Sequence, residues 1–542
     1  MHPIPSAALF GILGSTLAAC APTAETSLGK IQGGKCSSTE TNYFFSIPFA
    51  NPPVDELRFK APEKYTRHFN GTLDATKSTP FCIQFSSLFG ESSTQSEDCL
   101  YLNVWAPAGA SNGSNLPVKV WLYGGSNEGG GVADPAYDGC FSTTDSIMVS
   151  INYRLGPLGF LALKDLGLSG NFGTMDQIMG LEWVQENIAA FGGDPNKVLL
   201  FGQSAGATDT YTIATLEQAP KLMRAAAMES GGGRDLATVE EAQTVHGVFA
   251  NALNCSTTDI SCFRAASPAA LQFAVAAMPT PGVPEAYTQL CSSGARTNWG
   301  PLVDGSLIPV SPGTSGVRVP SIFGSNTNDG SLFVLAVYRK QTFSIGQAEY
   351  DAFLTHNFGS LAPRVNATFP LQSSNVSAAA LMTQIVTDAV YKCPAHRGLL
   401  AGARNGVPVW AYEFTHAPSC PWVSQLPAAI LPYVGVAHSA EIPFVFNTTT
   451  ALPRPDGNCS FTAKETALAG RMSRAWTDMA QYGRPGDEVA WPRFTEGVEV
   501  GVDLGHPLAG LVVGGVDYER CSQFWDQIDA AMALNQTQHE RR

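Results

Sequence analysis

The chain has 542 residues, of which 44% are hydrophobic and 14% are charged, and its formal net charge is −14 at pH 7. This composition supports a large buried core and excludes an intrinsically disordered chain. The sequence has no run of Lys and Arg that would bind a polyanion, so we expect neither nucleic acid nor an anionic membrane surface as a partner.

The N-terminus has the features of a secretory signal peptide, which we predict over residues 1–21. Residues 7–19 are apolar and end in small residues, but they are too few to span a bilayer. The preceding segment has only His2 and no Lys or Arg, and residues 17–20 (LAAC) also fit a bacterial lipoprotein box. No later segment is typical of a transmembrane helix.

Potential glycosylation sites favour simple secretion over lipoprotein export. Eight N-x-S/T sequons occur in the chain, a number that suits a secreted eukaryotic glycoprotein. They are at Asn70, Asn112, Asn254, Asn366, Asn375, Asn447, Asn458 and Asn535. We therefore predict a secreted, extracellular glycoprotein without a transmembrane anchor.

The first half of the mature chain alternates strands with helices. Apolar, β-prone runs predict strands at residues 100–105, 118–123, 147–153 and 198–201. Residues 174–190 form a predicted helix, since apolar residues recur on one stripe of it. The pattern predicts an α/β fold whose large, mostly parallel central sheet is flanked by helices.

The second half has a looser pattern. Residues 235–295 and 340–405 are mixed helical stretches, which we interpret as insertions because no Pro/Ser/Gly-rich linker sets them apart. Residues 319–323 and 407–414 predict further core strands, each with a proline at its second position, which is tolerated only near the start of a strand. We expect one domain over residues 22–542.

The segment Gly202-Gln203-Ser204-Ala205-Gly206 carries the main chemical signal. It follows a predicted strand and precedes a helix-compatible segment, which is the arrangement of the G-x-S-x-G nucleophile elbow. Both flanking residues are glycine because the turn leaves no room for a β-carbon, and Ser204 at its apex is strained and accessible. The pentapeptide alone also fits a Gly-rich turn of any α/β domain.

Longer motifs decide between these alternatives. The chain resembles the type B carboxylesterases, a family that includes cholinesterases and some fungal lipases, and it is closest in character to secreted fungal carboxylesterases. The resemblance implies an α/β-hydrolase fold with helical insertions over the active-site side, and it implies neither a metal nor an organic cofactor. It rests on residues 96–105 (SEDCLYLNVW), 152–161 (NYRLGPLGFL), 191–195 (FGGDP), 201–207 (FGQSAGA), 435–446 (GVAHSAEIPFVF) and 476–483 (WTDMAQYG).

A serine nucleophile needs a histidine base and an acidic residue that orients this base. In α/β-hydrolases the acidic residue follows the serine in the chain, and the histidine follows the acidic residue. On composition alone the base is open among His356, His396, His416, His438, His506 and His539. The resemblance of residues 435–446 to the family's histidine loop implies His438. The family usually has glutamate at the acid position, where this chain has Asp329, which is about 1.5 Å shorter. A cap on the turn before Gly330 is the alternative role for Asp329.

The resemblance also implies an oxyanion hole and supporting residues. Its backbone donors would be Gly125, Ser126 and Ala205, with Ser126 in place of the family's third glycine. The alternative is that residues 124–131 form only a mobile glycine-rich loop. Supporting polar positions around the site carried over from the family are Gln203, Ser230 and Glu441, and its paired charges near the site are Arg58 with Glu97 and Arg154 with Asp176.

Twelve cysteines suit an oxidising compartment. Removal of Cys20 with the signal peptide would leave eleven, so at least one is expected to be unpaired or to pair between chains. The family resemblance implies the disulfides Cys82–Cys99, Cys255–Cys262 and Cys393–Cys521. The pairing of Cys36, Cys140, Cys291, Cys420 and Cys459 is undetermined.

These residues predict a serine carboxylesterase that acts on a small-molecule ester. Cholinesterases have glutamate before the nucleophile and a tryptophan in the first disulfide loop, whereas this chain has Gln203 and no tryptophan between Cys82 and Cys99. The same loop is short for an interfacial lid, which disfavours the alternative of a lipase for longer-chain glycerides. An alternative of another class is a non-catalytic, cholinesterase-like adhesion protein. The natural ester, the chain-length preference and the oligomeric state are undetermined.

Overall fold

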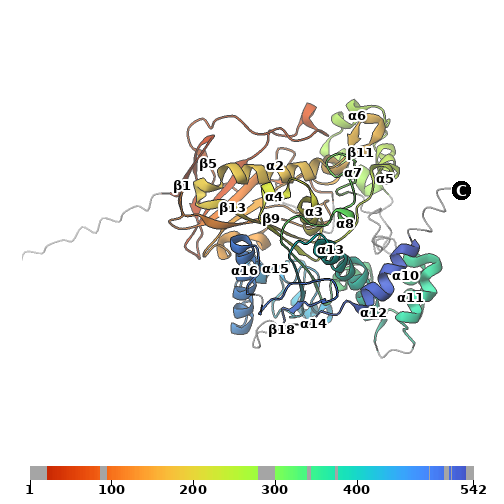
Figure 1. Ribbon diagram of the computed structural model, residues 1–542. Coiled ribbons are helices and arrows are strands. Elements are labelled where there is room, and N and C mark those ends of the chain that lie inside the picture. Colours follow the sequence, from red (N-terminus) through yellow and green to blue (C-terminus); the bar gives the residue numbers. More distant parts are fainter. Residues whose placement is uncertain are drawn as a thin grey trace, which may run out of the picture.

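The computed structural model describes residues 21–85, 94–278, 299–338, 344–372, 376–487, 489–505, 512–513 and 516–532. Its centre is an eleven-stranded sheet (Figure 1). The spatial order is β18 (Val512–Val513), β17 (Val502–Asp503), β16 (Val409–Phe414), β15 (Ser321–Asn326), β14 (Ala225–Glu229), β13 (Gly193–Gln203), β9 (Leu116–Leu122), β10 (Ile147–Ile151), β8 (Tyr101–Pro107), β4 (Thr41–Pro48) and β3 (Gly34–Lys35). Within this order the strands from β17 to β10 pair in parallel, whereas β8, β4 and β3 at one edge and β18 at the other pair antiparallel. The predicted α/β-hydrolase arrangement is confirmed.

Smaller strand groups lie outside the central sheet. One three-stranded sheet near the N-terminus and two short pairs complete the β-structure. These strands are β1 (Thr23–Thr26), β2 (Gly29–Gln32) and β5 (Leu73–Asp74), then β6 (Phe81–Cys82) with β7 (Gln95–Ser96), and β11 (Ala162–Leu163) with β12 (Leu168–Ser169).

Two core strands begin immediately after a proline. β15 starts at Ser321 and β16 at Val409, each one residue beyond the proline that the sequence places near the strand start. Proline has no N–H to give to a neighbouring strand, so the ladder starts at the first residue that has one. All residues of β14 and β15 are buried, as expected where helices cover both faces of a parallel sheet.

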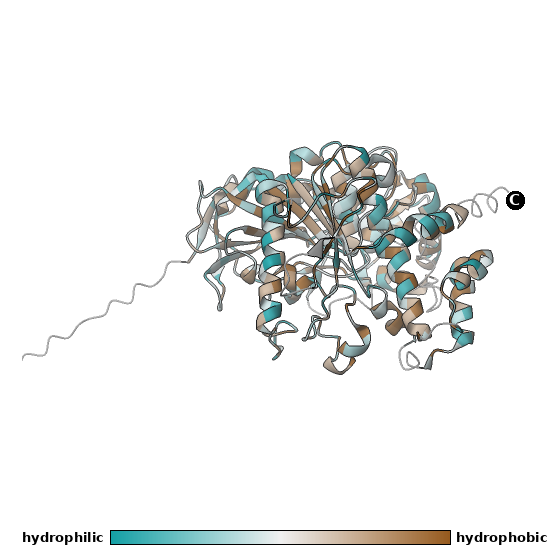
Figure 2. Ribbon diagram, turned by 60° about the horizontal axis from the view of Figure 1, so that its bottom comes forward, coloured by the Kyte–Doolittle hydropathy of each residue, from teal (hydrophilic) through white to brown (hydrophobic). Residues whose placement is uncertain are grey.

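Helices cover the sheet on both faces. α2 and α3 pack on one face against β13, and α16 packs against β9, β13 and β14 from the opposite side (Figure 1). The predicted helix over 174–190 is α2 followed by a 3-10 turn at Ile188–Phe191. Figure 2 shows hydrophobic strands in the interior and hydrophilic residues on outward helix faces. The helices are α1 (Gly156–Phe160), α2 (Phe172–Asn187), α3 (Ala205–Thr215), α4 (Ala219–Leu222), α5 (Val239–Ala252), α6 (Ile260–Ala265), α7 (Pro268–Ala277), α8 (Pro312–Ser315), α9 (Ser331–Tyr338), α10 (Gln347–Phe358), α11 (Ala362–Thr368), α12 (Ala378–Val386), α13 (Cys393–Arg404), α14 (Leu431–Val434), α15 (Ile442–Val445) and α16 (Ala463–Tyr482).

The two segments that the sequence marks as insertions contribute helices to one end of the molecule. α5, α6 and α7 gather at one corner and α10, α11 and α12 at another (Figure 1). A π-helical turn, η9 (Thr387–Lys392), links α12 to α13, and α13 packs directly on β15 and β16. The second segment therefore runs from the periphery back onto the central sheet.

Among the described residues, five disulfides link cysteines that are between 7 and 128 positions apart in the sequence. Three are the pairs that the family resemblance implies, and two, Cys36–Cys140 and Cys420–Cys459, settle cysteines whose partners were undetermined. Cys20 and Cys291 lie outside the described residues. The bonds are Cys36–Cys140, Cys82–Cys99, Cys255–Cys262, Cys393–Cys521 and Cys420–Cys459.

The asparagines of the described sequons differ in their exposure to solvent, and therefore in how accessible they are for glycosylation. Asn70, Asn112, Asn254 and Asn458 are exposed, whereas Asn366 and Asn447 are partly buried. Asn375, Asn535 and residues 1–20 of the predicted signal peptide lie outside the described residues. Among the helices that the structure describes, none is both long and apolar enough to cross a membrane.

Candidate active site

Ser204 lies between the end of β13 and the start of α3. Its backbone has φ 59° and ψ −125°, a combination that L-residues rarely adopt and that costs of order 1–3 kcal/mol. The turn is held by a hydrogen bond from the Ser204 N–H to the Glu229 carbonyl, 2.9 Å, and the Ser204 carbonyl accepts from the Ala207 and Thr208 N–H groups. The serine predicted as nucleophile is therefore the strained residue of a strand–turn–helix elbow.

The two glycines of the elbow are required by close backbone contacts. A β-carbon on Gly202 would lie 2.4 Å from the Gly206 carbonyl oxygen, and one on Gly206 would lie 2.1 Å from that of Leu122. Real β-carbons do not approach backbone atoms so closely, so neither position accepts a side chain without moving β9 away from the elbow.

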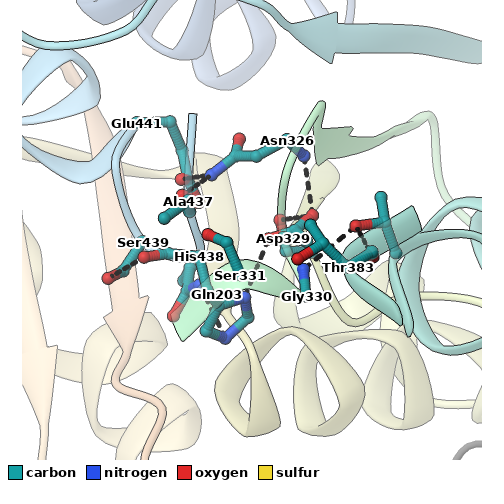
Figure 3. A network of polar contacts seen from close by, with 12 residues as sticks. Gln203, Asn326, Asp329, Gly330, Ser331, Thr383, Ala437, His438, Ser439 and Glu441 are labelled. Atoms are coloured by element: carbon teal, nitrogen blue, oxygen red, sulfur yellow. Dashed lines mark hydrogen bonds and ion pairs between the residues drawn. The ribbon is translucent and has the colours of Figure 1, made fainter. Parts of the chain in front are cut away.

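Asp329 and His438 are in direct contact although they are far apart in the sequence. Asp329 follows β15, and His438 lies in the loop between α14 and α15. The distance from His438 Nδ1 to Asp329 Oδ1 is 2.8 Å, so the shorter aspartate reaches the imidazole. The other carboxylate oxygen, Oδ2, accepts from Ser230 Oγ at 2.9 Å and from the Asn326 N–H at 2.7 Å (Figure 3). With both oxygens engaged, the carboxylate has a fixed orientation toward the imidazole.

Asn328 brings these two loops together. Its N–H donates to the Val436 carbonyl at 3.0 Å, and its side-chain oxygen accepts from the Val436 N–H at 3.1 Å. This pairing is continued by a bridge between Asn328 and Ala437. Asn328 therefore aligns the Asp329 and His438 loops.

Gln203 contacts the second imidazole nitrogen. Its Nε2 lies 3.1 Å from His438 Nε2, and Figure 3 shows the ring joined to both Asp329 and Gln203. When His438 donates through Nδ1 to Asp329, its Nε2 is an acceptor and the Gln203 amide can donate to it. Within the described residues the structure has no hydrogen bond between Ser204 Oγ and His438. His438, the predicted base, thus lies beside the elbow. Its Nε2, which does not contact Asp329, is hydrogen-bonded to Gln203, the residue that precedes Ser204.

The glycine-rich loop lies against the elbow. A β-carbon on Gly124 would be 2.9 Å from Ser204 Cβ, so this loop borders the serine directly. Gly125 and Ser126 have φ of 110° and 59°. In the described part of the chain, the N–H groups of Gly125, Ser126 and Ala205 donate to no protein acceptor. Ala205 follows the serine directly and Gly125 follows the glycine that borders it, so these unpaired donors are available to stabilise an oxyanion.

The loop over residues 124–131 is extensively hydrogen-bonded. The Gly125 carbonyl accepts from the N–H groups of Glu128 and Gly129, both at 3.0 Å, and the Asn127 carbonyl accepts from Gly156 at 2.7 Å. The Gln84 side chain exchanges two hydrogen bonds with the backbone of Gly130. These contacts connect the loop to its neighbours at several points.

A buried acidic group lies behind the Asp329–His438 pair. Glu441 is fully buried, and its Oε2 accepts a hydrogen bond from Asn326 Nδ2 (Figure 3). Burial, reinforced by the Asp329 charge, raises the pKa of Glu441 to about 8. Burial also raises the pKa of Glu229, whose Oε1 accepts from Trp476 Nε1 at 2.7 Å. The raised pKa favours the protonated form of Glu441, which reduces the negative charge next to Asp329.

The other predicted supporting residues form buried ion pairs. Arg58 Nε donates to Glu97 at 2.5 Å and its NH1 donates to the carbonyls of Arg264 and Ala266. Arg154 binds Asp176 through two nitrogens, at 2.8 and 2.7 Å. Because removal of one partner would leave an uncompensated buried charge, both pairs hold the connecting loops in place.

The other described histidine candidates lie in other contacts or elements of the fold. His396 Nε2 contacts Glu499 at 3.0 Å and its ring stacks on Tyr518. His416 contacts Glu465 at 3.2 Å, and His356 lies on α10. His506 and His539, like Leu88 and Phe89 of the short loop between Cys82 and Cys99, lie outside the described residues.

Three residues of the site carry no signal in the sequence. Asn326 links Asp329 to Glu441, Asn127 belongs to the glycine-rich loop, and Asp209 contacts Asn127 from α3. Each is a single polar residue in a segment whose pattern describes only a strand, loop or helix. Only the neighbours supplied by tertiary structure reveal their positions.

Comparison with known proteins places the chain among esterases. The model of the carboxylesterase family matches residues 21–507. The chain is 33% identical to para-nitrobenzyl esterase of Bacillus subtilis over 87% of its length and 92% of that protein. It is 32% identical to fumonisin B1 esterase of Sphingopyxis macrogoltabida, covering 88% of this chain and 85% of the relative, and 30% identical to human cocaine esterase, covering 86% and 84%. The expected closeness to fungal members stays a prediction.

Proposed function

The chain belongs to the carboxylesterase family and is a carboxylic ester hydrolase, and we propose that it works through an acyl-enzyme on Ser204. His438 is the base, Asp329 the acid that orients it, and Gly125, Ser126 and Ala205 supply the oxyanion hole. The observation that carries the proposal is the 2.8 Å hydrogen bond between Asp329 and His438 beside the strained Ser204.

The proposed reaction has two half-reactions. The Asp329 carboxylate accepts from His438 Nδ1, which leaves Nε2 to take the proton of Ser204 once the Gln203 amide moves aside. The serine oxygen attacks the ester carbonyl, and the three N–H groups stabilise the oxyanion. The alcohol leaves with the proton from His438, and water then attacks the acyl-enzyme by the same route.

The proposed substrate is a small, neutral carboxylic ester. Gln203 replaces the glutamate that precedes the cholinesterase nucleophile, and the loop between Cys82 and Cys99 has no tryptophan to bind a quaternary ammonium. The proposal extends to a single-domain protein that is secreted as a glycoprotein. The five disulfides among the described residues support secretion, because disulfides persist in oxidising compartments.

Hydrolysis of p-nitrophenyl esters by wild type and Ser204→Ala tests the mechanism. We expect the variant to lose at least 10³-fold in kcat, and equal turnover by both proteins would overturn the role of Ser204. An organophosphate should label wild type but not Ser204→Ala. Absence of labelling on folded wild type would favour the non-catalytic binding protein.

A panel of acyl chain lengths, with and without a lipid–water interface, separates esterase from lipase. We expect highest kcat/KM for short, dissolved esters and no gain at the interface, because the loop between Cys82 and Cys99 is short for a lid. Activation of long-chain glyceride hydrolysis at the interface would support the lipase alternative.

A further inference from the structure

The glycine-rich loop is tied to the helix that follows the nucleophile through one buried carboxylate. Asn127 Nδ2 donates to Asp209 Oδ1 at 3.2 Å, and Gln177 Nε2 donates to Asp209 Oδ2 at 2.6 Å. Asn127 follows Ser126 directly, and both have a positive φ, 57° and 59°. The carboxylate thus holds the residue next to a proposed oxyanion donor in a conformation that L-residues rarely adopt.

Asp209 occupies its position at an energetic cost. It is completely buried, and among the described residues no Lys, Arg or His forms a salt bridge with it. Burial raises its pKa to about 7, against the hydrogen bonds from Gln177 and Asn127, which lower it. Buried carboxylates without a cation are costly, and a neutral side chain would fill the same space without this cost.

The contact fixes the amide orientation of Asn127. Its Nδ2 faces the carboxylate, whereas its Oδ1 has no hydrogen-bond partner. A flipped amide would place Oδ1 against Asp209 Oδ1 and lose the hydrogen bond that Nδ2 donates, so the contact with Asp209 selects one orientation. A simple space-filling residue would not make this selection.

All three proposed oxyanion donors are thereby connected to α3, Ala205 as a residue of the helix and the glycine-rich loop through its contact with Asp209. Ala205, whose N–H is one donor, is the first residue of α3, and Asp209 lies four residues later on the same helix. One helical turn, about 6 Å of rise, separates them. The loop that carries the Gly125 and Ser126 donors is therefore hydrogen-bonded to α3, the same helix that carries the Ala205 donor.

We propose that Asp209 is a positioning residue, which sets the placement of the Gly125 and Ser126 N–H groups through its hydrogen bond to Asn127. The inference rests on the proposed acyl-enzyme function, because it assigns the loop to oxyanion binding. Asp209 touches no reacting atom. Its effect is on the transition state, since the oxyanion forms only after attack on the carbonyl.

Steady-state hydrolysis of a short p-nitrophenyl ester by Asn127→Ala, Asp209→Ala and the double variant tests the proposal. Active-site titration with an organophosphate normalises kcat to labelled Ser204, so unfolded protein does not enter the comparison. We expect each single variant to lower kcat about 10-fold to 100-fold, less than the loss of a whole donor, with KM changed less than threefold. The double variant should be no more than twofold slower than the slower single variant, because both changes break one link.

Two further variants separate positioning from general packing. Asp209→Asn keeps an acceptor for the Asn127 amide and should restore kcat to within threefold of wild type. Thr210→Val is the matched control, since Thr210 is the buried neighbour on α3 and its hydroxyl has no partner; its kcat should be unchanged.

The proposal is overturned if Asn127→Ala or Asp209→Ala retains wild-type kcat per labelled serine, or if the two effects multiply in the double variant. It is also overturned if the loss lies in KM. These outcomes differ from failure of the proposed function, in which wild type itself would not be labelled and Ser204→Ala would remain active.

Discussion

At the level of single residues, Asp329 contacts His438 in a setting that its neighbour Asn328 helps to form. Asn328 pairs with Val436 through its backbone and its side chain, which draws the His438 loop toward β15. Asp329 then reaches His438 Nδ1 at 2.8 Å. The aspartate side chain is therefore long enough to contact the imidazole in this loop arrangement.

Replacement of Asp329 by asparagine tests the orienting role of the carboxylate. The amide can donate to His438 Nδ1, which would put the ring proton on Nε2 and remove the acceptor needed by Ser204. We expect Asp329→Asn to lower kcat by about 10³–10⁴-fold with little effect on KM. Steady-state kinetics after active-site titration measure this, with Asp487→Asn on the surface as the control. A loss below tenfold would contradict the role.

The raised pKa of Asp209 predicts a pH-dependent contribution to stability. The native state holds this proton up to about pH 7, whereas the unfolded chain releases it near 3.8, the ordinary pKa of an aspartate side chain. The native state therefore binds more protons between these values, and the free energy of unfolding falls as pH rises from about 4 to 7. Asp209→Asn removes this pH-dependent fall in the free energy of unfolding, because an amide does not titrate in this range.

Urea unfolding of wild type and Asp209→Asn between pH 4 and 8 measures the effect. We expect the variant to gain stability relative to wild type as pH rises, by up to about 4 kcal/mol at pH 7 and above. Asp165→Asn, an exposed aspartate, is the control for net charge. Parallel curves for wild type and Asp209→Asn would show that the carboxyl does not titrate in this range.

At the scale of elements, the elbow depends on how closely β9, β13 and α3 approach one another. Gly206 leaves 2.1 Å between a would-be β-carbon and the Leu122 carbonyl oxygen, whereas Gly470 on α16 has open space around it. The same substitution should therefore have opposite effects at the two sites.

Alanine at each of these glycines tests the packing of the elbow. We expect Gly206→Ala to destabilise the protein by more than about 2 kcal/mol and to lower kcat per folded molecule. Gly470→Ala should stabilise by about 0.5–1 kcal/mol through helix propensity. Chemical denaturation measures both. A neutral Gly206→Ala would mean that β9 and α3 can separate without cost.

At the scale of the whole molecule, disulfides join elements that are remote in sequence. Cys393–Cys521 ties η11 (Cys521–Trp525) to α13 and spans 128 residues, whereas Cys255–Cys262 spans only 7. A cross-link that closes a longer loop removes more entropy from the unfolded chain.

Removal of each disulfide by a pair of alanine substitutions tests this difference. Loss of Cys393–Cys521 should cost about 2–3 kcal/mol more stability than loss of Cys255–Cys262, from the logarithmic dependence on loop length. Urea unfolding of the two oxidised variants gives the comparison. Equal losses would show that local contacts, rather than loop closure, determine these contributions.

The amino-acid sequence is sufficient to predict the features that depend on local pattern. Apolar runs, the stripe on α2 and the prolines before β15 and β16 predict the sheet and its flanking helices, because strand and helix periodicities are local properties. The Gly202–Gly206 pentapeptide predicts the elbow, since its steric demand involves immediate neighbours. Family motifs then imply His438, Asp329 and three of the disulfides.

The contacts between side chains of the site become visible only in the folded molecule. The Gln203 amide on His438, Asn326 between Asp329 and Glu441, and Asp209 beneath Asn127 join residues that are 235, 115 and 82 positions apart. No local period encodes such contacts, because they arise where separate strands and loops converge at one edge of the sheet. The raised pKa values of Asp209 and Glu441 have the same origin, since burial is a property of the folded molecule.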